Sequence, residues 1–306
     1  MIMHQHGFTY AATLAASQRI SWRVEDIIGG DRRLDFEKPF MPEALARTAA
    51  IDLLDAEERL LLNQIRGNGY LYIFGLVEEF ILPFVLDHAR PRLAGDDARA
   101  RAFLQFAGEE AKHIDLFKRF RREFEAGFAT NCDVIGPPEA IAQAVLAHHP
   151  LSVALLILHI EWMTQKHYVE SVKDDATLDR QFSDLLRHHW MEEAQHAKLD
   201  TLMVEELAKD MSGTDFAKAV DGYLEIGGMI DGGLAQQVAF DLDALVRASG
   251  RVLTAAERDA LTKQQHQAQR WTFIGSGMGH PNFLASVGAL HPESRQRLAE
   301  IVPTFC

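Results

Sequence analysis

The sequence predicts an all-α protein, and three observations support this class. Long segments repeat apolar residues at the spacing of a helix. Alternating runs rich in Val, Ile and Thr, which are typical of strands, are nearly absent. Clusters of glycine, proline and small polar residues separate the helical segments, but none resembles a flexible linker. We therefore expect a single domain over residues 1–306, a length that can bury a large core.

The expected helices follow from the apolar spacing and from the turn residues between them. They cover residues 42–65, 70–89, 97–127, 138–148, 151–173, 176–209, 215–248 and 255–275. The segment RGNGY at 66–70 is expected to separate the first two, because glycine destabilises a helix. Residues 70–210 are predicted to form a bundle, and the helices of 211–306 either cover it or form a dimer interface.

Composition narrows the class of partner and the compartment. The net charge of −13 argues against nucleic acid or an anionic membrane as the main partner. The most apolar run begins at Leu151, is too short to span a bilayer, and contains His159 and Glu161. Cys132 and Cys306 lie far apart and form no metal-binding pattern. No secretion signal is evident, so we expect a cytoplasmic protein with reduced thiols.

Two similar segments, EEAKH and EEAQH, contain the residues most informative about function. Glu110 with His113, and Glu193 with His196, lie one helical turn apart, so each pair can present an oxygen and a nitrogen to one ion. With 14 histidines in 306 residues, roughly one E-x-x-H is expected by chance. The longer E-E-x-x-H pattern is expected only about 0.1 times, so two copies indicate a paired site rather than exposed charges.

Each pair follows a helix that carries a lone glutamate, Glu79 before the first pair and Glu161 before the second. Antiparallel packing of these four helices would bring the pairs together, as in dimetal carboxylate bundles. Burying four carboxylates without compensation would cost on the order of tens of kcal/mol, whereas two divalent ions cancel their charge. Carboxylate and imidazole ligands suit iron or manganese, and the lack of thiolates argues against structural zinc.

The first of these helices has two adjacent glutamates, Glu78 and Glu79. At about 100° per residue, Asn63 and Arg66 fall roughly opposite Glu79 if one helical phase persists through the glycines. This pattern predicts Glu79 as the inward residue. Gly75, one turn earlier on that face, either leaves room beside the metals or marks a close helix crossing.

Two more glutamates, Glu109 and Glu192, directly precede the glutamates of the two pairs. A histidine that binds a metal needs an acceptor for its second ring N–H, and a carboxylate is a common choice. We expect Glu109 and Glu192 to supply this acceptor, each to the histidine of the opposite pair; the alternative is an exposed helix surface. Asp200, one turn after His196, is a further candidate for the same role.

His189 lies four residues before Glu193 and seven before His196, so these three side chains project along one helix face. A third histidine can therefore reach the same metal ion. Phe106 occupies the equivalent position before the first pair, so the two metal positions would differ. The alternative interpretation of His189 is a core or surface histidine.

Residues 70–200 resemble the ferritin-like dimetal superfamily, and the set of four glutamates and three histidines resembles the arylamine N-oxygenases of the aureothin and chloramphenicol pathways. In that family two irons activate O2, through a peroxo-diiron intermediate, to oxidise an aromatic amine towards a nitro compound. The resemblance implies metal binding by Glu79, Glu110, His113, Glu161, His189, Glu193 and His196. It further implies that Glu79, Glu110, Glu161, His189 and Glu193 take part in catalysis.

Other functions stay open. A desaturase or hydroxylase of acyl or small apolar substrates needs only six of the seven ligands, and a ferritin-like iron-binding or ferroxidase protein needs no organic substrate. A radical-generating reductase subunit is disfavoured, because Phe117 stands where such a protein has tyrosine. We expect a homodimer that receives electrons from a ferredoxin or reductase. Phe103, Phe106, Trp162 and Trp190 are candidates for the lining of a pocket for a small-molecule substrate, whereas core packing is the more common role for any one of them.

Overall fold

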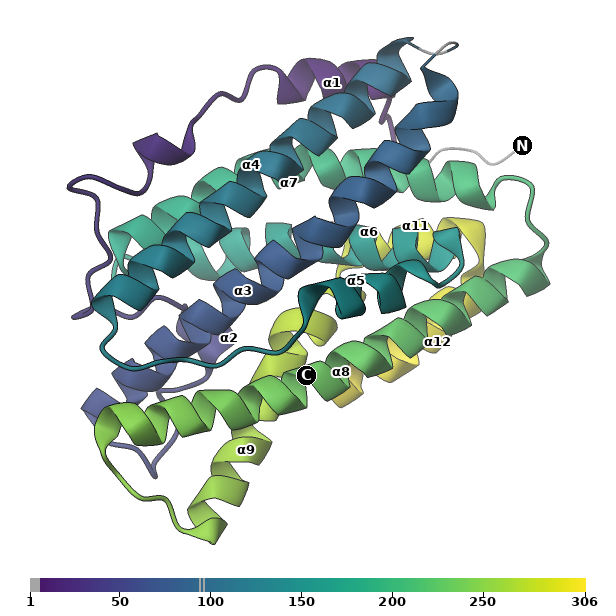
Figure 1. Cartoon of the computed structure of the whole chain (residues 1–306). Coiled ribbons are helices and arrows are strands. Elements are labelled where there is room, and N and C mark those ends of the chain that lie inside the picture. Colours follow the sequence, from purple (N-terminus) through teal and green to yellow (C-terminus); the bar gives the residue numbers. More distant parts are fainter. Residues whose placement is uncertain (1–5, 94, 96) are drawn as a thin grey trace.

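The computed structural model describes residues 6–93, 95 and 97–306, and in this part of the chain it contains helices and no strand (Figure 1). The α-helices are α1 Tyr10–Ser17, α2 Glu43–Ala46, α3 Ala56–Ala89, α4 Asp97–Gly127, α5 Pro138–Leu146, α6 Pro150–His167, α7 Arg180–Ala208, α8 Gly213–Ser249, α9 Ala255–Arg270, α10 Ser276–Met278, α11 Pro281–Leu290 and α12 Pro292–Ile301. Single π-helical turns extend α6 over Tyr168–Val172 and α9 over Trp271–Gly275. The predicted all-α class is confirmed.

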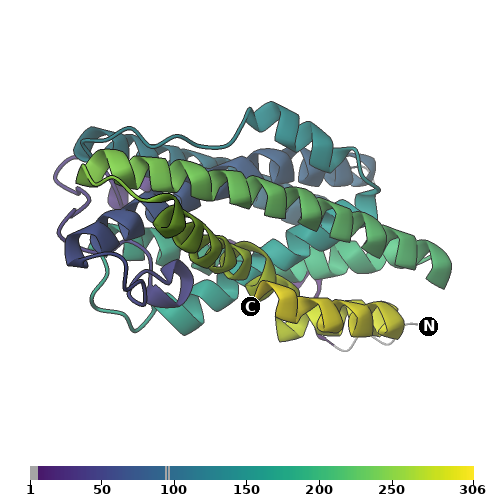
Figure 2. The same cartoon turned by 90° about the horizontal axis from the view of Figure 1, so that it is seen from below.

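Four long helices form the central bundle. Helix α3 packs along α4, helix α6 packs along α7, and α4 contacts α7 (Figure 1). The short N-terminal helix α1 lies on α4 and α7, whereas α8 runs along α3 and α6 on another side. Figure 2 shows α8 and α9 diverging from one end of the molecule. The helices after residue 211 therefore pack onto the bundle, as one of the two predicted arrangements requires.

Helix α3 is continuous, so the predicted break at residues 66–70 is wrong. The glycines there allow a close approach by neighbouring side chains. A Cβ atom on Gly67 would lie 2.9 Å from the Cβ atom of Phe40 and 3.3 Å from the ring of Phe182. These two rings stack on each other with centroids 5.4 Å apart. The loss of helix propensity at Gly67 is thus offset by aromatic packing across the helix.

The start of this helix also differs from the prediction of a helix over 42–65. Helix α2 ends after one turn because Arg47 adopts a left-handed conformation with φ of 49°. Helix α3 then begins at Ala56, where the side chain of Asp55 accepts a hydrogen bond from the backbone of Glu58 and the Glu58 side chain accepts one from the backbone of Asp55. This reciprocal capping box satisfies two free N–H groups and fixes the start of the helix.

Replacing Gly67 by alanine is expected to destabilise the protein by about 1–2 kcal/mol, because overpacking beside Phe40 outweighs the gain in helix propensity. Gly228 in α8 provides the matched control, since a Cβ atom there would meet nothing within 4 Å. Gly228→Ala is expected to stabilise the protein by roughly 0.5–1 kcal/mol. Urea unfolding of both variants measures the change in the free energy of unfolding. A change in the same direction for both substitutions would contradict this explanation of Gly67.

Helix α3 is long and apolar enough to cross a membrane by length and composition alone, with a mean hydropathy of 1.6 over its most apolar stretch. However, 61% of that stretch is buried inside the protein. The helix also buries several polar side chains, Asn63, Arg66 and Glu78 among them. These features are typical of the central helix of a bundle, and the polar ones lead to the functional site.

Candidate metal centre

Seven acidic and histidine side chains meet at the centre of the four-helix bundle, and each is at most 3% exposed. Helix α3 contributes one glutamate, α4 a glutamate and a histidine, α6 one glutamate, and α7 two histidines and a glutamate. They are Glu78, Glu110, His113, Glu161, His189, Glu193 and His196. Six of these seven were predicted from the sequence to meet, and the seventh, Glu78, replaces its neighbour.

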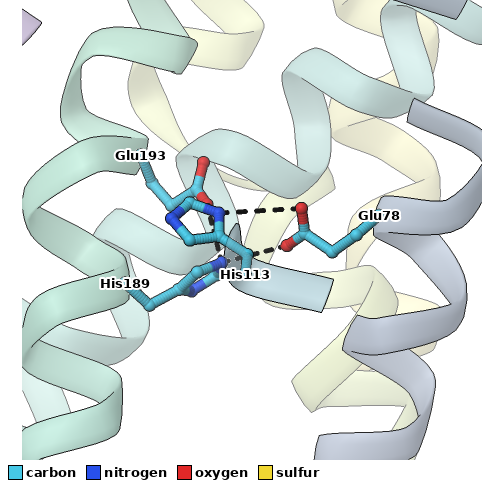
Figure 3. Close-up of side chains that lie close together, drawn as sticks. All are labelled: Glu78, His113, His189 and Glu193. Carbon is cyan, nitrogen blue, oxygen red and sulfur yellow. Dashed lines mark hydrogen bonds and ion pairs between the residues drawn. The ribbon is translucent and has the colours of Figure 1, made fainter. Parts of the chain in front are cut away.

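Four of these residues form a first group around His189 (Figure 3). The Nε2 atom of His189 lies 3.0 Å from Oε1 of Glu78 and 2.6 Å from Oε1 of Glu193. The Nδ1 atom of His113 lies 3.0 Å from Oε1 of Glu193 and 3.7 Å from Oε2 of Glu78. One atom from each of the four residues lies within 4.8 Å of the others, which is the spacing expected around a single ion.

A second group shares two residues with the first and adds Glu110 and His196. The Nδ1 atom of His196 lies 2.9 Å from Oε1 of Glu110 and 2.6 Å from Oε2 of Glu193. Glu193 therefore directs Oε1 towards the first group and Oε2 towards the second. A carboxylate placed in this way can bridge two neighbouring ions.

Glu161 lies beside these groups, although its oxygens belong to neither set of close ligand atoms. Its side chain is 2% exposed. Burial, together with the charge of Glu193 and a hydrogen bond between the two carboxyl groups, raises the pKa of Glu161 well above its usual range. Glu161 is thus positioned to hold a proton in the metal-free protein and to offer a carboxylate to a cation that displaces it.

Each of the histidines in the two motifs donates a hydrogen bond from its second ring N–H to a buried carboxylate of the opposite motif. The Nε2 atom of His113 lies 2.8 Å from Glu192, and the Nε2 atom of His196 lies 2.9 Å from Glu109. These are the crossed hydrogen bonds that the sequence predicted. They hold both rings so that Nδ1 faces the centre.

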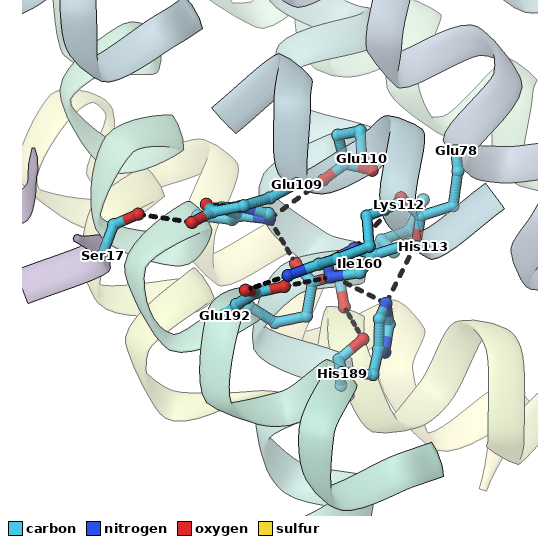
Figure 4. A network of polar contacts seen from close by, with 12 residues as sticks. Ser17, Glu78, Glu109, Glu110, Lys112, His113, Ile160, His189 and Glu192 are labelled. Carbon is cyan, nitrogen blue, oxygen red and sulfur yellow. Dashed lines mark hydrogen bonds and ion pairs between the residues drawn. The ribbon is translucent and has the colours of Figure 1, made fainter. Parts of the chain in front are cut away.

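The carboxylates of Glu109 and Glu192, called here the outer carboxylates, are held in turn by polar partners (Figure 4). Glu192 accepts a hydrogen bond from the ammonium group of Lys112, and Glu109 accepts hydrogen bonds from Ser17 at 2.5 Å and Gln105 at 2.9 Å. Sequence reasoning missed these three partners. The position of Lys112 inside the EEAKH motif was a usable signal, whereas nothing in the sequence linked Ser17 to the site.

The prediction for Asp200 is wrong. Its carboxyl group is fully buried, but both oxygens have no hydrogen-bond partner among the described residues. His196 is already bonded through Nε2 to Glu109, and its Nδ1 atom faces the centre, so no ring N–H remains for Asp200. Burial raises the pKa of Asp200 well above its usual range, because an ionised carboxylate there has lost its hydration.

The choice of Glu79 as the inward residue of α3 is also wrong. Its carboxylate lies 2.6 Å from the ammonium group of Lys118, and its side chain is 34% exposed. Glu78, by contrast, is 3% exposed and contacts both His113 and His189. Gly75 lies against α4, where a Cβ atom would stand 3.5 Å from Phe117, so it marks a close helix crossing.

The choice of Glu79 assumed that Asn63 and Arg66 lie on the exposed face of α3, but both side chains are buried. The Asn63 side chain accepts hydrogen bonds from the backbone N–H groups of Phe40 and Met41 in the N-terminal segment. Arg66 donates to the side chain of Gln265 in α9. Segments distant in sequence therefore cover the face of α3 that a two-sided helix would expose to water.

Several buried atoms of the centre have no hydrogen-bond partner among the described residues. They include both oxygens of Glu110, Oε1 of Glu193 and Nδ1 of His113. Buried polar atoms are normally paired with protein groups, water or ions. Carboxylates that face neutral imidazole nitrogens form a donor set that binds iron or manganese well. The residues present therefore fit two divalent cations that share Glu193.

Removing one outer carboxylate should weaken metal binding without removing a ligand. We expect Glu109→Gln to lower the affinity for Fe²⁺ by about 10- to 100-fold, because His196 would lose the charged acceptor that orients its ring. Glu125→Gln, also on α4, is the control, since its side chain is 58% exposed and pairs with Arg121. Metal titration of both variants measures the difference, and equal affinities would remove Glu109 from this role.

None of the four aromatic candidates for a pocket beside the metals lines the cavity between α3, α5, α6 and α8. Phe106 stacks on His196 with ring centroids 3.9 Å apart, and Phe103 packs near Tyr10. Trp190 stacks on Tyr168, whereas Trp162 stacks on His280 and lines a separate cavity of about 200 Å³. The cavity between α3, α5, α6 and α8 has a volume of about 360 Å³.

No family model and no curated protein matches this sequence. Among solved structures, a variant of an R2-like ligand-binding oxidase with an aerobically reconstituted Mn/Fe cofactor is 14% identical, with a TM-score of 0.49 over 88% of this chain and 98% of that chain. A second variant of that oxidase, with an Fe/Fe cofactor, is 16% identical with a TM-score of 0.47 over 88% and 94%. Similarity at this level carries no argument about chemistry, which depends on the site itself.

Proposed function

We propose that this chain is a dimetal oxygenase that binds two iron ions, with manganese as the alternative metal, and uses O2 to oxidise a small organic substrate. The observation that carries this proposal is the double contact of Glu193, whose two oxygens face two overlapping groups of carboxylates and histidines. When bound, two such ions would supply the electrons that activate O2.

The chain's own residues would prepare the centre in two ways. Glu109 and Glu192 fix the orientation of His196 and His113 before any ion binds, so little reorganisation is needed. Aromatic rings exclude water from the same region, with Phe117 and Phe74 packed edge-on against His189 at 5.0 and 5.6 Å. An apolar wall of this kind limits wasteful reaction of an oxidant with water.

The reaction that we favour is N-oxygenation of an aromatic amine. Its support is the third histidine, His189, which is 1% exposed and contacts both Glu78 and Glu193. Six ligands suffice for the other oxygenase classes that share this bundle, whereas the seven-residue set is the pattern of the arylamine N-oxygenases. A desaturase or hydroxylase of an apolar substrate is the second candidate, because the cavity of about 360 Å³ between α3, α5, α6 and α8 is apolar.

Turnover would also require electrons from outside the chain. No flavin- or nicotinamide-binding pattern is evident in the sequence, so we propose a ferredoxin or reductase as the donor. A test must therefore supply reducing equivalents chemically or with a surrogate reductase.

The test of the proposed function is reconstitution with Fe²⁺ under argon, followed by O2, a reductant, and a panel of neutral and carboxylated arylamines. We expect two irons per chain and hydroxylamine or nitro products by mass spectrometry. His189→Ala is expected to keep its iron but lose most of the product. Loading far beyond two irons without amine oxidation would instead indicate storage, and a hydroxylated or unsaturated product from an apolar substrate would support the second candidate.

A further inference from the structure

The apolar cavity of about 360 Å³ opens to the surface between α5 and α8 and extends inward to α3 and α6. At its rim, the lining residues Ala140 and Ala144 of α5 are exposed, and Met229 of α8 is 42% exposed. Its inner wall includes the buried side chains of Phe74 and Ile160. A molecule can therefore enter between two helices that lie outside the central four.

The inner wall of the cavity is also part of the wall around the metal centre. Val77 directly precedes Glu78 on α3, and Ile160 directly precedes Glu161 on α6. The ring of Phe74 lines the cavity and meets the ring of His189 edge-on, with centroids 5.6 Å apart at an angle of 88°. A single aromatic side chain thus stands between the bottom of the cavity and one histidine of the centre.

The chemistry of the lining restricts the charge of an occupant. Every lining residue is apolar or glycine except Gln236, which lies on the exposed side of α8. Burying an ionised carboxylate in this cavity, where no lining cation can pair with it, would weaken the binding free energy by roughly several kcal/mol or more. A neutral molecule has no such cost and gains from the burial of its apolar surface.

The volume restricts the size of the occupant. An apolar cavity of about 150 Å³ can hold benzene. In proportion, about 360 Å³ accommodates a molecule of roughly 14 non-hydrogen atoms, or two linked aromatic rings. This size falls within the range of ordinary ligand pockets.

We infer that this cavity is the substrate site of the proposed oxygenase, and that it selects a neutral, apolar aromatic amine of about two rings over a carboxylated one. That the bound molecule is a substrate rests on the proposed function, whereas the preference for a neutral ligand follows from the lining of the cavity alone. This preference predicts that simple aminobenzoates, whose carboxylate has no partner in the lining, bind poorly.

The test uses 4-aminobiphenyl and its 4′-carboxylate, with the neutral 4′-carboxamide, which has as many non-hydrogen atoms as the carboxylate, as the control for size. Binding to the full iron-loaded chain is measured by calorimetry at pH 7.5 with O2 excluded, so that no turnover occurs. Gly233→Leu places a side chain in the cavity, where a Cβ atom already approaches Ile135 at 3.4 Å. Gly232→Leu is the matched control, because a Cβ atom on the adjacent Gly232 meets nothing within 4 Å.

We expect 4-aminobiphenyl to bind wild type and Gly232→Leu equally, and Gly233→Leu at least about tenfold more weakly. The carboxylate is expected to bind at least about tenfold more weakly than the neutral carboxamide of equal size, and equal binding of these two would contradict the preference for a neutral occupant. Ala140→Leu, at the exposed rim, is a second blocking variant should Gly233→Leu fold poorly. Undiminished binding to the folded blocking variants would overturn the inference. Oxidation of the bound amine after O2 is admitted then tests the proposed function separately.

Discussion

Replacing Glu193 by glutamine is expected to abolish the binding of both metal ions. Its two carboxylate oxygens lie 2.6–3.0 Å from the facing nitrogens of His113, His189 and His196, so both ions would depend on it. An amide offers one weak oxygen ligand and no negative charge, and it leaves two divalent ions with too little negative charge to balance them. Metal analysis after anaerobic loading with Fe²⁺ and gel filtration measures the loss.

The paired control for this variant is Glu79→Gln. Glu79 is paired with Lys118 at the surface, so two ions should remain bound with unchanged affinity. Glu78→Gln, one position away, should instead lower the iron content or affinity, because Glu78 contacts His189 at 3.0 Å. Retention of two irons by Glu193→Gln, or their loss from Glu79→Gln, would contradict the arrangement described here.

The metal-free protein is expected to lose stability as the pH rises from about 6 to 8.5, because several buried groups bind a proton more tightly in the folded chain than in the unfolded chain. Burial alone would lower the pKa of His113, but the charge of Glu193 and hydrogen bonds to the surrounding glutamates outweigh it and hold the pKa well above 6.5. The same balance raises the pKa of His196. Burial raises the pKa of Glu161 and Asp200.

All four of these shifts act in the same direction as the pH rises. A raised pKa in the folded protein means that folding is favoured by the bound proton, and this stabilisation is lost as pH rises through the folded pKa. For the carboxyl groups the loss begins above the ordinary values of 4.5 for Glu161 and 3.8 for Asp200. For the histidines it begins above 6.5. Glu193, whose pKa is lowered, acts oppositely and contributes stability that is lost as pH falls below 4.5.

Bound metal should reverse this dependence, since cations displace the protons and bind more tightly as pH rises. Urea unfolding of metal-free and iron-loaded protein under argon, at several pH values between 6 and 8.5, measures both trends. Saturating metal at about 1,000 times its dissociation constant would add about 4 kcal/mol per independent site. A metal-free protein whose stability rises over this interval would contradict the assignment of these buried protons.

The part of the site that could be predicted from the sequence is the part encoded within single helices. Spacing of three and four residues fixes which side chains share a face, so Glu110 with His113, and His189 with Glu193 and His196, follow from helix geometry. The crossed hydrogen bonds were also predictable, because a metal-binding histidine needs an acceptor and only a few carboxylates lie near enough. Local periodicity and ligand chemistry therefore determined most of the centre.

The rotation of α3 could not be predicted in the same way. Its polar residues Asn63 and Arg66 are buried by Met41 and its neighbours and by Gln265, and no local pattern reveals those distant partners. Gly67 likewise looked like a helix break, because its packing against Phe40 depends on the N-terminal segment. Tertiary contacts overrode helix propensity at each of these positions.

The cavity was missed for a related reason. Candidate lining residues were chosen for being aromatic and near the ligands in sequence, yet Phe106 and Trp190 stack on other rings of the core. The actual lining comes largely from α5, α8 and the inner faces of α3 and α6, whose relative placement is set by the assembled fold. Pocket residues drawn from several elements carry no shared sequence period.

The most direct test of the dimetal centre is the anomalous scattering of a crystal of the iron-loaded protein, measured at the iron absorption edge. Two peaks about 3.5–4 Å apart are expected at the centre of the bundle. Glu193 should bridge them, with Glu78, His113 and His189 around one and Glu110 and His196 around the other. A single peak, two peaks without Glu193 between them, or a peak bound by Glu79 would contradict the account.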